Sequence, residues 1–169
     1  MLFNRTAAGI LLLLSGLPMS PSAAQTPIPD ALAAPGEIVV LRVKADGDQV
    51  YDCKTGADGK LAWVLRGPMA TLITRGEIIG YHYPGPTWEL RDGSAVVGKM
   101  AASVPGATPD DIPWLKLEVA SGRGNGLLSG VTTVLRINTQ GGKPDGACEA
   151  DGASRKVPYT AEYLFLRKA

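Results

Sequence analysis

"WLKLEVAS", residues 114–121, is the stretch that decides the fold class. Three apolar side chains alternate in it with more polar or smaller ones: Leu115, Leu117 and Val119 against Lys116, Glu118 and Ala120. A period of two puts successive side chains on opposite faces of a β-strand. "VLRIN", residues 134–138, repeats the pattern with Leu135 and Ile137 on either side of Arg136. Both stretches predict strands with one buried face and one wet face, and the pattern places Arg136 on the wet face.

Similar apolar runs fill most of the chain, namely "EIVVLRVKADGDQVYDCK", "LAWVLRGP", "MATLIT", "EIIGYHYPG", "TWELRDGSAVVGKMAAS" and "PYTAEYLFLR". In the first run, Asp-Gly within residues 45–48 is typical of a hairpin turn. The 21 glycines and 13 prolines interrupt the chain too often for long helices. We therefore expect an all-β fold of about eight to ten short strands, either an antiparallel sandwich or a small closed β-barrel. Periodicity does not give strand order, so both architectures stay open.

The first 24 residues have the pattern of a secretory signal peptide. Arg5 gives a positive start, residues 7–17 an apolar core, and "SAA" at residues 22–24 a small-residue cleavage site. The apolar core is about 11 residues, whereas a membrane-spanning helix needs roughly 20. Charged residues interrupt every later apolar run, so no membrane span is expected after signal removal. We expect a secreted or periplasmic protein with a Pro/Ala-rich leader, residues 25–35, and a single β domain, residues 36–169.

The charge balance argues against one class of function, and the cysteines predict a covalent link. The chain has 17 basic and 16 acidic residues, and one of the basic ones lies in the predicted signal peptide. Nucleic-acid binding requires a basic stripe, which a near-neutral mature chain without basic clusters does not offer. Cys53 and Cys148 are the two cysteines, and in an oxidising compartment such a pair predicts one disulfide.

The single histidine, His82, lies in "YHYPGPTWELRDG", residues 81–93. The two prolines of this stretch fix φ and lack a backbone N–H, so the corner is a turn or a sheet edge. In one interpretation, His82 is a packing residue whose ring hydrogen-bonds a backbone carbonyl or Glu89. In the other, the rigid corner is the rim of a binding pocket lined by His82, Tyr83, Trp88 and Glu89.

Other chemical motifs are missing from the sequence. It contains no serine nucleophile elbow, no phosphate loop and no His-Glu-x-x-His pair. Zinc and copper sites usually draw on several His or Cys ligands, so we expect no metal and no cofactor. Asp-Gly pairs are explained as turns, and "RGNGLLSG", residues 123–130, as a long flexible loop between strands.

A series of short motifs runs through the chain: Tyr51-x-Cys53, Trp63, Gly80-x-His82, Gly85-Pro86-Thr87-Trp88, Asp92-Gly93-Ser94, Ile112-Pro113-Trp114-Leu115, Asn138-Thr139-x-Gly141-Gly142, Cys148 and Val157-Pro158-Tyr159-Thr160-Ala161-x-Tyr163. This series resembles an uncharacterised secreted family, shared by bacteria and fungi, that is catalogued as a domain of unknown function. The resemblance covers nearly all of the mature chain. It implies a small exported domain with a Cys53–Cys148 link and no established activity. The segment before Trp63 is short and polar, which puts in doubt any pocket that relatives build there.

Three functions fit these observations. The first is a non-catalytic binding module that presents His82, Tyr83, Trp88 and the glycine-rich loop to a small molecule, a glycan or a cell-envelope partner. The second is a structural envelope protein without a dedicated site. The third is a hydrolase or lyase that uses His82 as a base with a carboxylate. The fold alone does not choose among them; the absence of catalytic motifs favours the binding module and leaves catalysis undecided.

Overall fold

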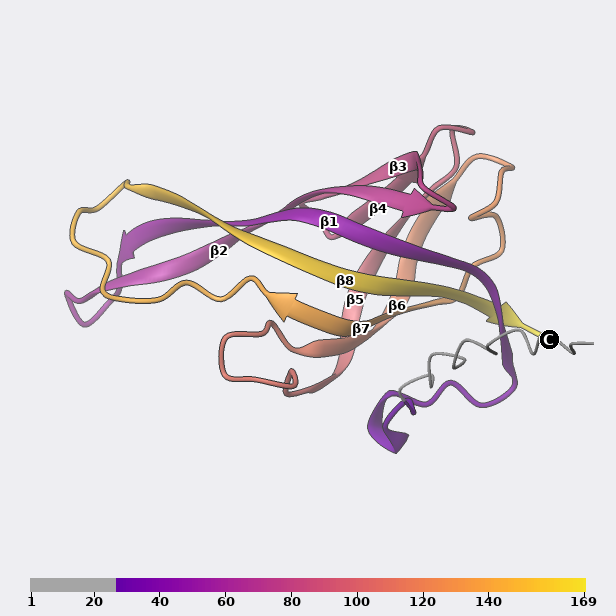
Figure 1. The fold of residues 1–169 in the computed structure, drawn as a ribbon, viewed down its shortest axis with the longest axis horizontal. Helices are drawn as coiled ribbons and strands as arrows, with labels where there is room; N and C mark the ends of the chain where they lie inside the picture. Colours follow the sequence, from indigo (N-terminus) through magenta and orange to yellow (C-terminus); the bar gives the residue numbers. More distant parts are fainter. Residues whose placement is uncertain (1–26) are drawn as a thin grey trace, which may run out of the picture.

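The computed structural model describes residues 27–169, so the predicted signal peptide, residues 1–24, lies outside the described residues. Eight antiparallel strands form one closed barrel in chain order, and β8 pairs back to β1 (Figure 1). The strands are β1 (Glu37–Thr55), β2 (Leu61–Thr74), β3 (Glu77–Tyr83), β4 (Thr87–Leu90), β5 (Ala95–Val104), β6 (Trp114–Arg123), β7 (Thr133–Gly141) and β8 (Ser154–Lys168), preceded by a 3-10 turn, η1 (Asp30–Leu32). The all-β prediction is confirmed, and of its two architectures the structure has the barrel.

β1 corrects one prediction, because residues 45–48 are not a hairpin turn. The strand runs without a break through Gly47, which lies opposite Ala70 of β2. A Cβ atom on Gly47 would lie 2.3 Å from the carbonyl oxygen of Met69. Glycine is therefore needed here for close approach of two strands, and not for a turn. The Asp-Gly signal is the same in both cases, which is why the sequence pattern misled.

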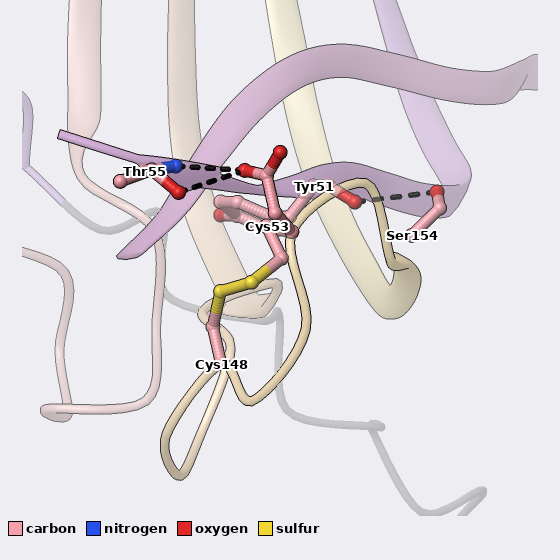
Figure 2. Close-up of a disulfide and its surroundings, with 6 residues drawn as sticks. Tyr51, Cys53, Thr55, Cys148 and Ser154 are labelled. Atoms are coloured by element: carbon pink, nitrogen blue, oxygen red, sulfur yellow. Dashed lines mark hydrogen bonds between the residues drawn. A yellow bond between two sulfur atoms is a disulfide. The ribbon is translucent and has the colours of Figure 1, made fainter. Parts of the chain in front are cut away.

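β1, β2 and β8 are longer than the other strands, and together they extend beyond the barrel, to the left in Figure 1. Near the end of this extension, Cys53 of β1 is bonded to Cys148 in the connection between β7 and β8 (Figure 2). Their Cα atoms are 5.6 Å apart, within the usual range for a disulfide. The Cys53 amide donates to the carbonyl of Ala153 at 2.7 Å, which fastens the same connection a second time. The predicted disulfide is confirmed.

The inner face of the barrel holds the larger apolar cluster. Leu115, Leu117 and Val119 of β6 face this interior, as their alternation predicts. β7 has the opposite arrangement from the one expected: Leu135 and Ile137 belong to a cluster on the outer face, and Arg136 faces the interior. The prediction that Arg136 occupies the wet face is therefore wrong.

The N-terminal segment explains this inversion. Leu32 of η1 is completely buried on the outer face of the barrel, where it packs with a cluster made up of Trp114, Leu135, Ile137, Leu164 and Leu166. The Lys116 ammonium group donates to the carbonyl of Ala33 at 2.7 Å and holds the segment down. The outer face of β7 is thus covered by protein, so its apolar side chains are buried there.

The glycine-rich connection between β6 and β7 closes one end of the barrel. The side chain of Leu128 is buried in the interior cluster. The Asp92 carboxylate accepts a hydrogen bond from the Leu127 amide at 2.7 Å, and the Ser94 hydroxyl accepts one from the Leu128 amide at 3.2 Å. These contacts make the connection a plug for the barrel. In residues 27–169, no helix combines the length and the apolar character that crossing a membrane requires.

Candidate functional site

The short β3–β4 hairpin leaves an opening in the barrel wall. β2 pairs with β3 only from Ala70, which lies opposite His82, and β5 pairs with β4 only up to Val97, opposite Thr87. Residues 61–69 of β2 and 98–104 of β5 therefore continue past the hairpin without β3 or β4 between them. The proline turn, residues 84–86, lies at the end of the hairpin, above this opening.

A cavity of about 520 Å³ lies behind the opening, and every one of the eight strands contributes to its wall. Its inner part is lined by Gln49, His82, Trp88, Arg136 and Tyr163. Its rim consists of Leu65, Arg66, Pro86, Lys99 and Met100. The volume falls within the roughly 300–1,000 Å³ that is usual for small-molecule sites.

His82 and Trp88 form an aromatic pair in the inner wall. They lie opposite each other on β3 and β4, with ring centroids 4.4 Å apart and an angle of 5° between the ring planes. Tyr163 packs edge-on against both rings. Gly98 on β5 makes room for this arrangement, since a Cβ atom there would lie 3.0 Å from Trp88. The result is a rigid floor of three aromatic rings.

The His82 ring is neutral and has one fixed hydrogen bond. Its Nδ1 lies 2.8 Å from the carbonyl oxygen of Thr87. A carbonyl only accepts, so Nδ1 carries the proton and Nε2 carries the lone pair. Burial lowers the pKa of His82 to about 3; the bond to Thr87 opposes this shift, and the nearby charge of Arg136 adds to it. The packing interpretation expected a hydrogen bond from the ring to a backbone carbonyl or to Glu89, and the structure has the backbone carbonyl.

Arg136 brings a positive charge to the cavity wall. Its Nε and Nη2 donate to the carbonyl oxygen of Pro113 at 3.0 and 2.9 Å. The salt bridges found in residues 27–169 do not include Arg136. A charge in a largely apolar interior is costly unless it is paired. Arg136 thus donates to a neutral acceptor on one side and has no counter-ion among residues 27–169.

Other polar groups of the inner wall also lack partners. Within the described part of the chain, these buried atoms are Gln49 Nε2, Trp88 Nε1 and the hydroxyl of Tyr163, together with the neighbouring hydroxyl of Tyr159. Burial raises the pKa of both tyrosines, and Arg136 partly offsets this by lowering it. The two hydroxyls and Arg136 are close enough to influence one another electrostatically, without good hydrogen-bond geometry between them. A buried polar group without a partner costs about 1–3 kcal/mol.

The four residues predicted to form a binding site divide between two faces of the hairpin. His82 and Trp88 line the cavity together with the proline turn, whereas Tyr83 and Glu89 do not contribute to it. The Tyr83 hydroxyl donates to Glu89 at 2.7 Å, and Arg123 pairs with the same carboxylate at 2.8 Å. These bonds hold the pKa of Glu89 below its usual value. A binding role for Tyr83 and Glu89 stays a prediction.

Sequence reasoning missed Gln49, Arg136 and Tyr163. For Gln49 a signal was present: Val43, Ala45, Gly47 and Gln49 keep a period of two, which indicates one face once β1 is read as a single strand. For Arg136, the apolar neighbours Leu135 and Ile137 predicted the wrong face of the strand.

Metal ligation gains no support from the geometry, since residues 27–169 hold no group of three or more His, Cys, Asp or Glu side chains suited to an ion.

The chain was compared with curated proteins, solved structures and protein families. Neither the curated proteins nor the solved structures gave a match to the chain. A family model described as "Protein of unknown function (DUF3455)" matches residues 34–78 and 73–167. These two matches extend from just before β1 to the end of β8. The chain therefore belongs to the DUF3455 family, proteins of unknown function.

Proposed function

We propose that the protein is exported and that it acts, as a secreted or periplasmic protein, by binding a small molecule inside its barrel without transforming it. The observation that carries the proposal is the cavity of about 520 Å³ beneath the proline turn, with its unpartnered polar groups. Rigid aromatic and proline walls lower the entropic cost of binding. Barrel interiors reached from one opening are common ligand sites.

Binding is better supported than catalysis. A general base works best with a pKa near the operating pH, whereas burial lowers the pKa of His82 to about 3. The wall of the cavity in the described chain contains no acidic side chain to act with it. Glu89, the carboxylate that the sequence grouped with His82 in the expected site, is engaged with Tyr83 and Arg123 instead. The hydrolase or lyase hypothesis therefore lacks its second residue.

The geometry also favours a small molecule over a glycan or a purely structural role. Sugar platforms need exposed aromatic faces, but His82 and Trp88 are stacked on each other and are 2% and 1% exposed. A purely structural barrel has no need of unpartnered polar side chains, because apolar ones of similar size would be more stable there. Three side chains with such polar groups, Gln49, Trp88 and Tyr163, meet in the lining of one cavity, which supports a binding role.

A substitution that fills the cavity tests the proposal. Leu115 lines the cavity, so Leu115→Trp should occupy it, while Leu127→Trp places the same side chain at a position that is 61% exposed and outside the lining. The neutral dye N-phenyl-1-naphthylamine, which fluoresces in apolar sites, is the probe. We expect saturable binding of one dye per chain by the wild type and by Leu127→Trp, and loss of binding in a folded Leu115→Trp variant. Equal binding by all three proteins, or no saturable binding at all, would refute the proposal.

A further inference from the structure

We propose, resting on the function proposed above, that the ligand is an amphiphilic carboxylate: its carboxylate group binds Arg136 inside the barrel and its apolar chain leaves through the opening between β2 and β5. The proposal rests on three features of the cavity. These are an uncompensated positive charge in its inner wall, hydrogen-bond donors around that charge, and exposed apolar side chains at its rim.

The inner wall is suited to an anion. Arg136 lines the cavity, and no acidic side chain of the described chain forms a salt bridge with it. The unpartnered atoms Gln49 Nε2 and Trp88 Nε1 can only donate, and the Tyr163 hydroxyl can donate as well. Among the described residues, the inner wall of the cavity thus combines one positive charge with several donors and no carboxylate.

A carboxylate fits this set better than a phosphate. The guanidinium group has a planar fork of donors that matches a carboxylate, and it remains charged at all relevant pH values. Among the described residues, Arg136 is the one cation of the inner wall, because the buried ring of His82 is neutral. A single positive charge balances a singly charged carboxylate, whereas a doubly charged phosphate would keep an uncompensated negative charge in the barrel.

The rim is suited to an apolar chain. Leu65 on β2 and Met100 on β5 are 51% and 62% exposed, although both are large apolar side chains. Exposed apolar groups gathered at a cavity mouth are typical of binding sites. Lys99 and Arg66 lie at the same rim, where their positive charge would attract an anion; Arg66 also pairs with Asp52. This arrangement orients the ligand with its charged end inward.

The test compares three probes of one chain length: decanoate, decanol and decyltrimethylammonium. Their binding is measured by displacement of N-phenyl-1-naphthylamine from the purified protein, with isothermal titration as a check. We expect decanoate to bind most tightly to the wild type. Arg136→Met should weaken decanoate binding about 10- to 100-fold, the loss expected for a charge-assisted hydrogen bond. Decanol binding should change little.

Two further variants serve as controls. Arg42→Met removes an exposed arginine that pairs with Glu162 on the outer face, and it should leave all three affinities unchanged. Arg136→Lys keeps the charge and should retain part of the preference for decanoate over decanol. If Arg136→Met does not fold, Arg136→Lys takes its place in the test. Added salt should then weaken the binding of decanoate more than the binding of decanol, and equal salt dependence of the two probes would overturn the proposal.

The outcomes separate the two proposals. If decanol binds and Leu115→Trp abolishes its binding, but Arg136→Met binds decanoate as tightly as the wild type does, then the carboxylate assignment is wrong and the binding function stands. If decyltrimethylammonium binds most tightly, the assignment of an anion is likewise refuted. If none of the three probes displaces the dye, and the dye itself does not bind, both proposals fail.

Discussion

Acid should destabilise the barrel through His82, the single histidine of the chain. Its ring is 2% exposed, stacks on Trp88, and faces Tyr163 and the charge of Arg136. Burial is the main reason that its pKa falls from 6.5 to about 3, with Arg136 acting in the same direction and the Thr87 carbonyl opposing. In the folded protein the ring therefore resists protonation, whereas in the unfolded chain it takes up a proton near its ordinary pKa.

The sign and the size of the effect follow from proton linkage. Well above pH 6.5 the ring is neutral in both states, and its contribution to stability is complete. As the pH falls from 6.5 towards 3, the unfolded state binds a proton that the folded state does not, so the free energy of unfolding decreases. Between about pH 7.5 and about pH 4.5, the loss amounts to about 3 kcal/mol.

Urea unfolding of the wild type and of His82→Phe at several pH values measures this loss. Phenylalanine keeps an aromatic ring over Trp88 but cannot titrate; it also gives up the bond to Thr87, at a cost of about 1 kcal/mol. Hydrogen bonds hold the pKa below its usual value at four carboxylates, which titrate alike in both proteins: Asp52, Glu89, Asp92 and Asp111. The variant should therefore lose about 3 kcal/mol less than the wild type over this pH interval. Parallel pH profiles for the two proteins would refute the reasoning.

Three further predictions concern stability. Replacing both Cys53 and Cys148 by Ala should lower the free energy of unfolding by up to about 4–5 kcal/mol and the melting temperature by about 10 °C, with no further effect of reductant in calorimetry; a melting curve equal to that of the wild type would contradict this. Leu32→Ala should cost about 2–4 kcal/mol in urea unfolding, because it empties a buried position, whereas Leu127→Ala at an exposed position should cost less than about 0.5 kcal/mol; similar costs at both positions would show that the N-terminal segment does not pack as described. Gly47→Ala should destabilise the barrel by more than about 3 kcal/mol in the same assay, because its Cβ would collide with the β2 backbone; a variant as stable as the wild type would mean that the strands can separate without loss.

The sequence predicted the fold class because strand and turn chemistry are local. The alternation of Leu117 with its neighbours gives the correct buried face of β6, and the two cysteines give the correct disulfide. The prediction failed at Gly47, where a close contact between strands has the same residue pattern as a turn. Because of this error, the predicted strand was about half as long as β1, and Gln49 was not expected on the inner face. A local pattern cannot report a contact with a strand that lies about 20 residues away.

Of the four residues expected to form a binding site, His82 and Trp88 line the cavity and the other two do not, and a binding role stays a prediction for all four. Local alternation along β3 and β4 puts His82 on one face and Tyr83 on the other, but it does not say which of the two is inside. In β7 the uncertainty is of the same kind: Arg136 and its apolar neighbours alternate correctly, and the apolar ones are buried, yet on the outer face. Which face of β7 points into the barrel depends on whether its other face is covered. That covering comes from Leu32, which is far away in the sequence.

The covered outer face also explains how the barrel can carry Arg136 in its interior. The apolar side chains of β7 and β8 that face outward, Leu135 and Leu164 among them, are buried by the N-terminal segment. Burial of apolar area stabilises a fold by about 25 cal/mol per Å² wherever it occurs. This part of the sheet is therefore stabilised from its outer side, and its inner side can hold a charge and hydrogen-bond donors without loss of the fold. Stability and ligand binding then depend on opposite faces of the same strands, so Arg136→Met should change affinity far more than stability, and Leu32→Ala should do the reverse.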